Sequence, residues 1–168
     1  MSAAILEALQ TRFGDAILSR HDLHGDETAL VDAGRIREIC FWLRDQPELA
    51  FDQLIDLTAV DTLGYDERAS GRFEVVYHLR SIRHGHRLRL KAGLDEGDGG
   101  ENPRIDSVFP VWKGANWFER EVWDMYGVKF EGHPDLRRIL MYEEFIGHPL
   151  RKDYPKEKRQ PLVRRDFT

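Results

Sequence analysis

Hydrophobic residues recur at helical spacing in three segments of the chain, which predicts three amphipathic helices. The apolar positions of the first two helices are Ile5, Leu6, Leu9 and Phe13, and Ile36, Ile39, Cys40 and Leu43. Gly14 supplies a C-terminal cap for the first helix, and the second ends before Pro47. The third helix runs from about residue 114 to residue 126, with apolar and charged positions on different arcs.

Strand patterns fill the space between these helices. Residues 15–31 predict two strands around a turn at residues 24–26, and residues 54–63 predict a largely buried strand, with a helix as the alternative for so short an apolar run. Two clearer strands alternate through Phe73, Val75, Tyr77 and Leu79, and through Leu88, Leu90 and Ala92. The short connection at residues 83–85 indicates an antiparallel hairpin. We therefore predict an α+β fold with a mixed or antiparallel sheet and helices packed mainly on one face.

Beyond Phe130 the hydrophobic periodicity fades, and prolines interrupt every long helix. These prolines are Pro134, Pro149, Pro155 and Pro161. We predict an α+β domain over residues 1–130, which includes the third helix, and an extended C-terminal arm over residues 131–168. Residues 150–168 carry seven Lys and Arg against three Asp and Glu, a net charge of +4 in a chain whose total is −5.

Three interpretations of this arm compete: a disordered basic tail, a contact with nucleic acid, and a segment that becomes ordered against a protein partner. We favour the third, because the arm holds more apolar and aromatic residues than a solvating tail needs. They are Met141, Tyr142, Phe145, Ile146, Leu150, Tyr154, Leu162 and Phe167. The rest of the chain is acidic, which argues against nucleic acid. Isolated protein should then have a protease-sensitive C-terminus.

Composition narrows the function classes further. A chain of 168 residues with 41% hydrophobic and 33% charged residues suits one globular domain with an appendage. Its longest apolar runs are far too short to span a bilayer. The N-terminus has neither a basic start nor a long apolar segment, so we do not expect a secretory signal.

Cofactor binding by this chain alone is not expected. An iron–sulfur cluster usually takes about four cysteine thiolates, and the chain has only Cys40, which lies on the apolar face of the second helix and is predicted to be core. The glycine-dense segment at residues 97–100 lacks the third glycine of a dinucleotide fingerprint and the Lys-Ser or Lys-Thr of a phosphate loop. We interpret it as a flexible surface loop.

The most informative segment spans residues 119–140. Its charged and histidine positions are Glu119, Arg120, Glu121, Asp124, His133, Arg137 and Arg138. Together with Tyr126, Gly127, Phe130 and the Leu136–Leu140 run, these positions resemble the signature of the C (30 kDa) subunit of respiratory complex I, the proton-pumping NADH:quinone oxidoreductase. A second segment, residues 147–155, resembles the tail that follows this signature. The pattern fixes about a dozen positions, so chance is a poor explanation.

The resemblance implies a non-catalytic structural subunit of the peripheral arm of the complex, packed against the D subunit and neighbouring iron–sulfur subunits of the quinone-reducing module. It implies that flavin, iron–sulfur clusters, NADH and quinone belong to other subunits, that membrane association comes only through the complex, and that the location is the cytoplasmic side of the bacterial inner membrane. The isolated chain should have no activity. The arm residues expected to contact a partner are Tyr142, Phe145, His148, Pro149, Leu150, Arg151, Lys152, Asp153 and Tyr154.

The charged residues of the third helix need partners, because the helix is also strongly aromatic. Arg120, Glu121 and Asp124 share one arc, opposite Phe118, Val122, Met125 and Tyr126. We predict that Glu121 or Asp124 pairs with Arg137 or Arg138 in a desolvated setting, with Arg137 as the first choice. The signature would then be a structural ion-pair network, and a solvated charged face is the alternative.

Histidines raise two further possibilities. His84 and His86 lack a third ligand at suitable spacing, so we interpret them as surface residues. His133 and His148 each stand between glycine and proline, which suits a turn in which the ring hydrogen-bonds the backbone or a carboxylate. The alternative from another class is a metal-dependent hydrolase that uses Glu121, Asp124 and His133. The alternative within the same lineage is a scaffolding subunit of a membrane-bound hydrogenase or of an F420- or ferredoxin-linked dehydrogenase.

Overall fold

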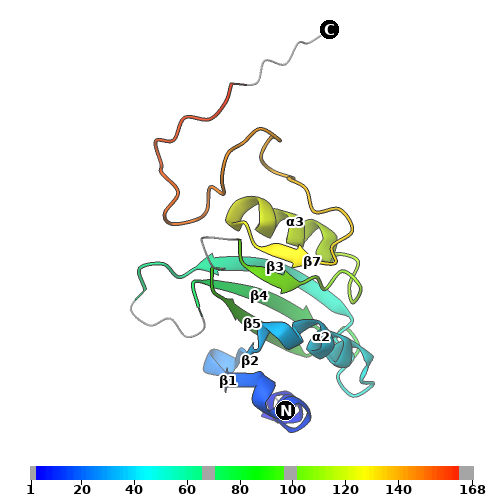
Figure 1. The fold of residues 1–168 in the computed structure, drawn as a ribbon. Coiled ribbons are helices and arrows are strands. Elements are labelled where there is room, and N and C mark those ends of the chain that lie inside the picture. Colours follow the sequence, from blue (N-terminus) through cyan, green and yellow to red (C-terminus); the bar gives the residue numbers. More distant parts are fainter. Residues whose placement is uncertain (1–2, 66–70, 97–101, 163–168) are drawn as a thin grey trace.

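The computed structural model describes residues 3–65, 71–96 and 102–162. Its α-helices are α1 (Ala3–Phe13), α2 (Ile36–Asp45) and α3 (Ala115–Tyr126), and its strands are β1 (Ile17–His21), β2 (Thr28–Val31), β3 (Gln53–Asp61), β4 (Phe73–Arg80), β5 (Arg87–Leu94), β6 (Arg104–Asp106) and β7 (Lys129–Glu131) (Figure 1). Short 3-10 turns at Gly14–Ala16, Leu23–Gly25 and Ala33–Arg35 join the first elements. All three helices and all five strands predicted from the sequence are present.

Five strands form one mixed sheet in the order β1-β2-β5-β4-β3. The pairs β1–β2, β3–β4 and β4–β5 are antiparallel, whereas β2 and β5 are parallel. Two short strands, β6 and β7, form a separate parallel pair that the sequence pattern did not predict. The α+β prediction with a mixed sheet is therefore confirmed, and the β6–β7 pair was missed because three-residue strands carry no readable alternation.

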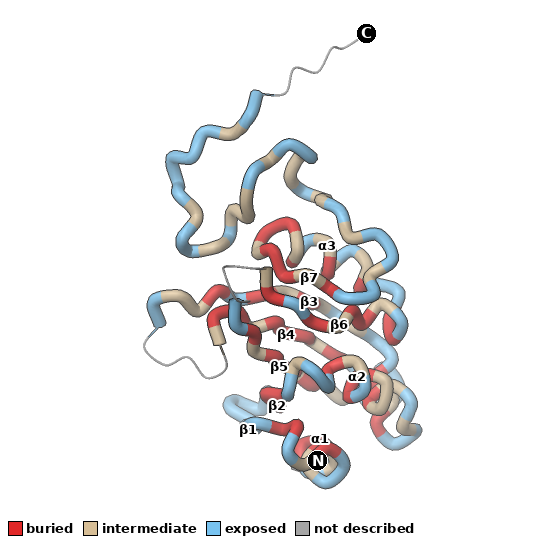
Figure 2. The backbone as a smooth tube through the Cα atoms, in the orientation of Figure 1, coloured by how far each residue is buried: buried red, intermediate tan, exposed pale blue. Residues whose placement is uncertain are grey.

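The hydrophobic core lies between the sheet and the helices (Figure 2). Inward residues of β4 and β5 alternate as predicted, and α2 lies across the sheet while α3 packs on the edge strand β3 (Figure 1). Cys40 is fully buried in this core, which confirms its predicted position, and burial raises the pKa of its thiol. No helix among the described residues is long and apolar enough to cross a membrane.

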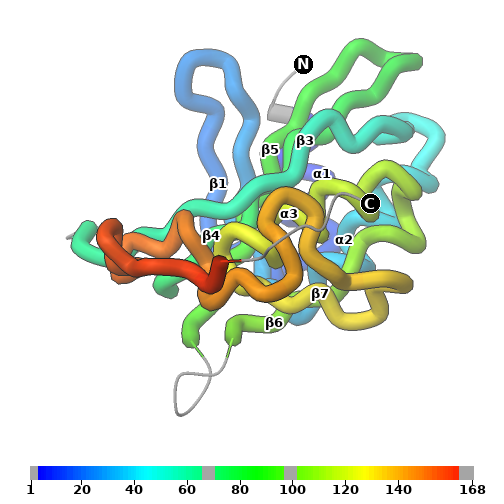
Figure 3. Tube along the Cα trace, turned by 90° about the horizontal axis from the view of Figure 1, so that it is seen from above, coloured from blue at the N-terminus to red at the C-terminus, as the bar shows by residue number. Residues whose placement is uncertain are grey.

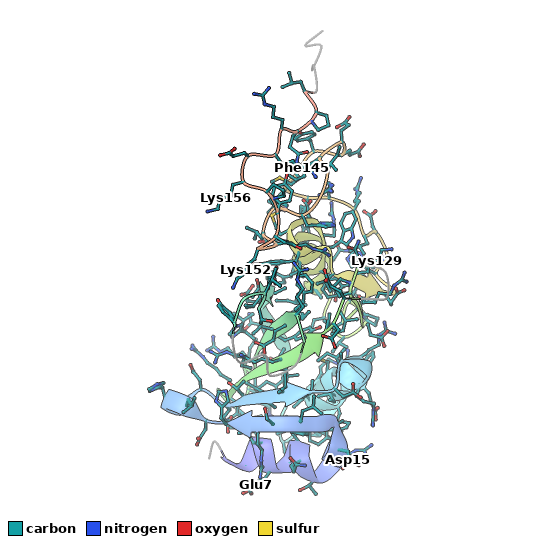
Figure 4. All side chains as sticks on the ribbon, turned by 60° about the vertical axis from the view of Figure 1, so that its left-hand side comes forward. Glu7, Asp15, Lys129, Phe145, Lys152 and Lys156 are labelled. Carbon is teal, nitrogen blue, oxygen red and sulfur yellow. The ribbon has the colours of Figure 1, made fainter. Side chains whose placement is uncertain are left out.

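After β7, residues 132–162 contain no helix or strand. This segment is the described part of the predicted arm. It crosses α3, turns back toward the sheet and then leaves it again (Figure 1). Figure 4 shows Lys152 close to the sheet, with Phe145 and Lys156 farther out. The division of the chain at residue 130 remains a prediction, and the predicted glycine loop at residues 97–100 lies outside the described residues.

Candidate functional site

The junction between α3 and the arm is organised by Asp124, whose side chain is fully buried. One carboxylate oxygen accepts a hydrogen bond from Arg138 Nη1 at 2.5 Å. The other accepts the N–H groups of Ile139, Leu140 and Met141 at 3.1, 2.8 and 2.9 Å. Four donors converge on one carboxylate, so the arm is folded around the charge of Asp124.

Arg138 extends this contact along the arm. Its Nη2 donates to the carbonyl oxygens of Phe145 at 2.8 Å and Gly147 at 3.1 Å. The guanidinium also lies 5.7 Å from the ring centre of Trp123 and 5.6 Å from that of Phe145. Because Arg138 is only 13% exposed, these contacts are made in a poorly solvated setting.

The environment of Asp124 favours its ionised form. Burial alone would raise the pKa of this carboxyl, but the hydrogen bonds from Met141, Leu140 and Arg138 outweigh burial and hold the pKa below its usual value. The carboxylate therefore stays charged at neutral pH, which the pairing with Arg138 requires.

Two sequence predictions about this network are corrected. Arg137 does not pair with α3: its side chain is 69% exposed and contacts Asp135 at 2.9 Å. Glu121 is exposed and outside the ion pairs of the described residues. Asp124, which shares the predicted polar arc with Glu121, is buried beneath the arm, in agreement with the predicted desolvated pairing. The predicted pairing of Asp124 with Arg138 is confirmed.

Arg120 contacts the same segment from the helix side. Its Nε and Nη2 donate to the carbonyl oxygens of Arg137 and Arg138, both at 3.2 Å. Its guanidinium lies 5.3 Å from the ring centre of Trp117, which is 63% exposed. Arg120 thus binds the backbone of the arm and makes no carboxylate pair among the described residues.

Glu119 forms a second buried contact that the sequence interpretation missed. Its carboxylate accepts hydrogen bonds from Ser107 Oγ at 2.6 Å and from the Val108 N–H at 2.7 Å. Burial raises the pKa of Glu119 to about 7, although these hydrogen bonds oppose the rise. The signal was present in the sequence, because Glu119 falls on the same helical stripe as Ala115 and Val122, which face the core.

Both arm histidines hydrogen-bond the backbone, as their position between glycine and proline predicted. His133 Nε2–H donates to the Asn116 carbonyl at 3.1 Å, while its Nδ1 accepts the Asp135 N–H at 3.0 Å. His148 Nδ1–H donates to the Asp124 carbonyl at 3.0 Å. Burial lowers the pKa of both rings, so the neutral form fits these positions.

Farther along, the arm contacts the end of the sheet through an ionic cluster. Asp61 at the end of β3 accepts the Lys152 N–H at 2.8 Å and pairs with Arg72 at 3.2 Å. Arg72 also pairs with Asp153 at 2.7 Å, and Arg151 Nε donates to the Tyr126 carbonyl at 2.6 Å. Asp61 is 3% exposed and Arg72 is 7% exposed, so the arm reaches a nearly buried ion pair.

The remaining predicted arm residues are arranged around this path. Phe145 packs its ring edge-on against Tyr142 and stacks on Tyr154, with ring centres 5.7 and 6.1 Å apart. The Leu150 N–H, next to Pro149, donates to the carbonyl of Met125 at 3.1 Å, although the Leu150 side chain is 52% exposed. Aromatic contacts thus hold the arm together where it leaves the helix.

The geometry does not favour the hydrolase alternative. Asp124 is saturated by Arg138 and backbone donors, Glu121 is exposed, and His133 binds backbone groups. Across residues 3–65, 71–96 and 102–162, no group of three or more His, Cys, Asp and Glu side chains could hold a metal ion. Glu121, Asp124 and His133 are therefore not brought together as metal ligands.

A groove remains open between α3 and the arm. It has a volume of about 820 Å³ and is lined by Trp123, Leu136, Met141 and Tyr142, together with charged residues and the end of the arm. Exposed apolar side chains lie along the same segment, with Leu140 56% and Ile146 56% exposed. The groove therefore combines apolar surface with the exposed charged side chains of Arg137, Glu143 and Glu144, while Arg138 is largely buried.

Comparison with known proteins agrees with the resemblance seen in the sequence. Residues 29–160 match the family model described as respiratory-chain NADH dehydrogenase, 30 Kd subunit. The C subunit of NADH-quinone oxidoreductase from Roseiflexus sp. (strain RS-1) is 47% identical over 92% of this chain and 84% of its own length. The protein of the same name from Geobacter sulfurreducens is 47% identical over 88% of this chain and 85% of its own.

Solved structures give the same result. Nqo5, solved as its trypsin-resistant fragment (1-134), matches 81% of this chain and 100% of that fragment with a TM-score of 0.66 and 29% identity. A chain of the archaeal membrane-bound sulfane sulfur reductase shares the fold, with a TM-score of 0.63 and 24% identity over 83% of this chain and 75% of its own. Together with the fold and the signature geometry, these matches show that the chain belongs to the 30 kDa subunit family of respiratory-chain NADH dehydrogenase, the C subunits of NADH-quinone oxidoreductase (complex I).

Proposed function

We propose that this chain is a non-catalytic structural subunit in the peripheral arm of proton-translocating NADH:quinone oxidoreductase, where it packs against the D subunit of the quinone-reducing module. The relatives that it matches over most of their length are named as C subunits of that enzyme. Its role is to position neighbouring subunits, and it carries out no step of electron transfer itself.

The observation that carries this proposal is that Glu119, Asp124 and Arg138 of the signature bind other groups of the same chain. Asp124 and Arg138 bind each other and the backbone of residues 139–147. Glu119 binds the loop at residues 107–108. These contacts satisfy the charged groups internally, so none of the three is free to act on a substrate. These three signature residues therefore fix the conformation of the α3–arm junction and of the loop at residues 107–108.

The surface that this junction presents suits a protein partner. Apolar side chains that are more than half exposed follow the arm at Leu140, Ile146, Leu150 and Leu162, and the groove above Trp123 lies among them. A run of exposed apolar residues on one segment is typical of an interaction site. We assign this surface to the contact with the D subunit.

The length of the arm argues in the same direction. Ordering a residue costs about 1–2 kcal/mol of backbone entropy, so an arm without helix or strand needs contacts beyond those within the chain. The related Nqo5 was solved as a trypsin-resistant fragment (1-134), and that fragment in its full length matches 81% of this chain. This supports a protease-resistant body followed by a more accessible end.

The redox groups are proposed to belong to other subunits. The chain has one cysteine, which is buried, and an iron–sulfur cluster usually needs about four thiolates. Iron–sulfur clusters are therefore assigned to neighbouring chains, and we propose that the flavin, NADH and quinone sites belong to those chains as well. Membrane association is proposed to come only through the complex, on the cytoplasmic side of the bacterial inner membrane.

Purification of the complex from cells that express a tagged full-length chain tests this proposal. We expect flavin, several iron–sulfur subunits, the D subunit and quinone reductase activity in the same particle, with no activity in the isolated chain. Nickel in the particle would instead support the hydrogenase-type alternative. Turnover or a stoichiometric cofactor in the chain alone would contradict a structural role.

A variant separates assembly from chemistry. Asp124→Ala should lower the amount of assembled complex while each assembled complex keeps its normal turnover, because the lost contact shapes an interface. Glu121→Ala is the matched control on the same helix, since that carboxylate is exposed. Normal assembly with lost electron transfer in Asp124→Ala would argue for direct chemistry by this residue.

A further inference from the structure

The β4–β5 hairpin carries a concentration of positive charge that the arm does not explain. Between residues 75 and 94 the chain has five Lys and Arg and three His, but no Asp or Glu. The whole chain has a net charge of −5. The hairpin is thus a basic element on an acidic protein. Asp26, Glu27 and Asp56 line a hollow beside Arg87 and Arg89, so the excess of positive charge lies toward the turn at residues 80–87.

Three of its arginines have no counter-charge in the ion pairs of the described residues. Arg89 pairs with Asp26 and Lys91 pairs with Glu74, whereas Arg80, Arg83 and Arg87 occur in none of these pairs. Arg80 and Arg87 are direct cross-strand partners and both are exposed. Like charges placed opposite each other on a sheet are destabilising. The repulsion between Arg80 and Arg87 is not offset by an ion pair of either residue among the described residues.

The tip of the hairpin is nevertheless firmly built. The Ile82 N–H donates to Asp52 Oδ1 at 3.0 Å, and His84 Nε2–H donates to the Pro47 carbonyl at 2.8 Å. Within the turn, the Gly85 N–H donates to the Ser81 carbonyl at 2.9 Å, and the His84 and His86 rings stack 5.5 Å apart. Contacts with the loop before β3 therefore hold the tip in one conformation.

One apolar side chain stands among these charges. Ile82 is 64% exposed at the turn, next to Arg83 and between the two strand arginines. An exposed apolar anchor with arginines on both sides of it in the sequence has the composition of a protein interface, in which Arg is enriched and a few anchors dominate. Preorganisation of the turn also reduces the entropy lost on binding.

We propose that this hairpin tip, formed by Arg80, Ile82, Arg83 and Arg87, is a docking site for an acidic segment of another polypeptide in the complex. Carboxylates of that segment pair with the three arginines, and one of its apolar side chains packs on Ile82. The inference rests on the proposed function as a subunit, and it adds a second contact surface. Figure 3 shows the hairpin, in green at the top right, on the side away from the end of the arm in red.

Protein fits this surface better than nucleic acid does. Residues 80–87 contain no Phe, Tyr or Trp on which bases could stack, and Tyr77 of β4 is fully buried. The rings of His84 and His86 stack on each other, and His84 is held by the Pro47 carbonyl. One exposed isoleucine is also too little apolar surface to insert into a lipid headgroup layer. An acidic polypeptide needs only the charges and the single anchor that the tip provides.

Two measurements on the full complex test the proposal. A photoreactive amino acid in place of Ile82 should cross-link, in the purified particle, to an Asp- and Glu-rich segment of a different subunit, identified by peptide mass spectrometry. The double variant R83E/R87E should lower retention of that subunit about tenfold or more in a salt wash, because two attractions become repulsions. The control is R20E, a single charge reversal at an exposed arginine of β1 outside the described ion pairs.

The outcomes are distinct from those of the proposed function. If the tagged chain does not co-purify with iron–sulfur subunits, the proposed function fails and this inference falls with it. If it co-purifies, the inference alone is overturned by cross-links only within the chain, by cross-links to nucleic acid or lipid, or by equal retention in R83E/R87E and R20E. Thermal melts of both variants check folding. If R83E/R87E does not fold, the cross-link from position 82 alone shows whether an acidic segment of another subunit binds the hairpin tip.

Discussion

Two adjacent arginines at the start of the arm differ in burial and in the groups they contact, which makes them a useful pair for measuring the α3–arm junction. Arg138 is 13% exposed and pairs with the fully buried Asp124. Arg137 is 69% exposed and pairs with Asp135, which is itself 54% exposed. Replacing each by alanine removes one guanidinium from the same segment of chain.

The expected magnitudes differ by the cost of an uncompensated buried charge. Breaking a buried ion pair by removing one partner costs about 3–5 kcal/mol, whereas an exposed pair contributes about 0–1 kcal/mol. In Arg138→Ala the Asp124 carboxylate keeps three backbone donors, but the carbonyls of Phe145 and Gly147 lose theirs. We therefore expect about 3 kcal/mol for Arg138→Ala and less than about 1 kcal/mol for Arg137→Ala.

Hydrogen exchange at the Leu140 and Met141 amides measures this loss where it occurs, because both N–H groups donate to Asp124. A cost of about 3 kcal/mol corresponds to protection lowered about 100-fold or more in Arg138→Ala, against less than about fivefold in Arg137→Ala. Adding Asp124→Asn to Arg138→Ala should cost clearly less than the sum of the two single changes, since both remove the same interaction.

Equal protection in the two arginine variants would refute the reasoning, because burial would then have no energetic consequence at this junction. Additive costs of Asp124→Asn and Arg138→Ala would refute the pairing itself. A fall in protection that spread to the β4 and β5 amides would show that the junction belongs to the global unfolding unit of the domain.

Three further predictions concern neighbouring features. Burial raises the pKa of Glu119 to about 7, so between about pH 4.5 and 7 the folded protein binds more protons than the unfolded chain. The free energy of unfolding should therefore fall by about 3 kcal/mol as pH rises through that window. Urea denaturation at several pH values should show this loss, and Glu119→Gln should abolish it. Gly127→Ala should lower the melting temperature more than Gly14→Ala. Both glycines have positive φ (+80° and +48°), which costs about 1–2 kcal/mol for alanine. Of the two, only Gly127 has neighbours that a Cβ would meet, the side chains of Arg151 and His148, at 2.6 Å each. Trypsin should cut the isolated chain first after Lys156, Lys158 or Arg159 and should cut the same sites slowly in the assembled complex; equal rates would count against an arm that binds a partner.

The regular elements were predictable because their periodicity is local. The alternation of β4 and β5 and the stripe of α2 follow from which side chains face one core, and a single sequence records this directly. The parallel pairing of β2 with β5 was not readable, since it depends on how distant segments meet. The three-residue strands β6 and β7 are too short to show a pattern.

The sequence predicted which residues form the candidate site, but it predicted only some of the contacts between them. Charge and spacing indicated that Asp124 needs an arginine from residues 137–138, but they could not choose between two adjacent arginines, which point in different directions in an irregular segment. The same limit applies to Glu119, whose partners at residues 107–108 lie in a loop without periodicity. Irregular backbone carries no repeat from which side-chain direction can be inferred.

Helix α3 serves two surfaces because its two buried carboxylates lie five residues apart, about 140° around the helix axis. Glu119 faces inward and fixes a loop with one hydroxyl and one N–H donor, which leaves burial dominant and raises its pKa. Asp124 faces the arm and receives four donors, one of them an arginine, so its pKa falls. The inner contact can thus survive protonation as a neutral hydrogen bond, whereas the outer one depends on charge. Acidification should therefore release residues 138–141 of the arm from Asp124 before it disturbs the loop at residues 107–108. His133, at the start of the arm, lies 3.9 Å from the Glu119 carboxylate and is expected to remain with the inner contact.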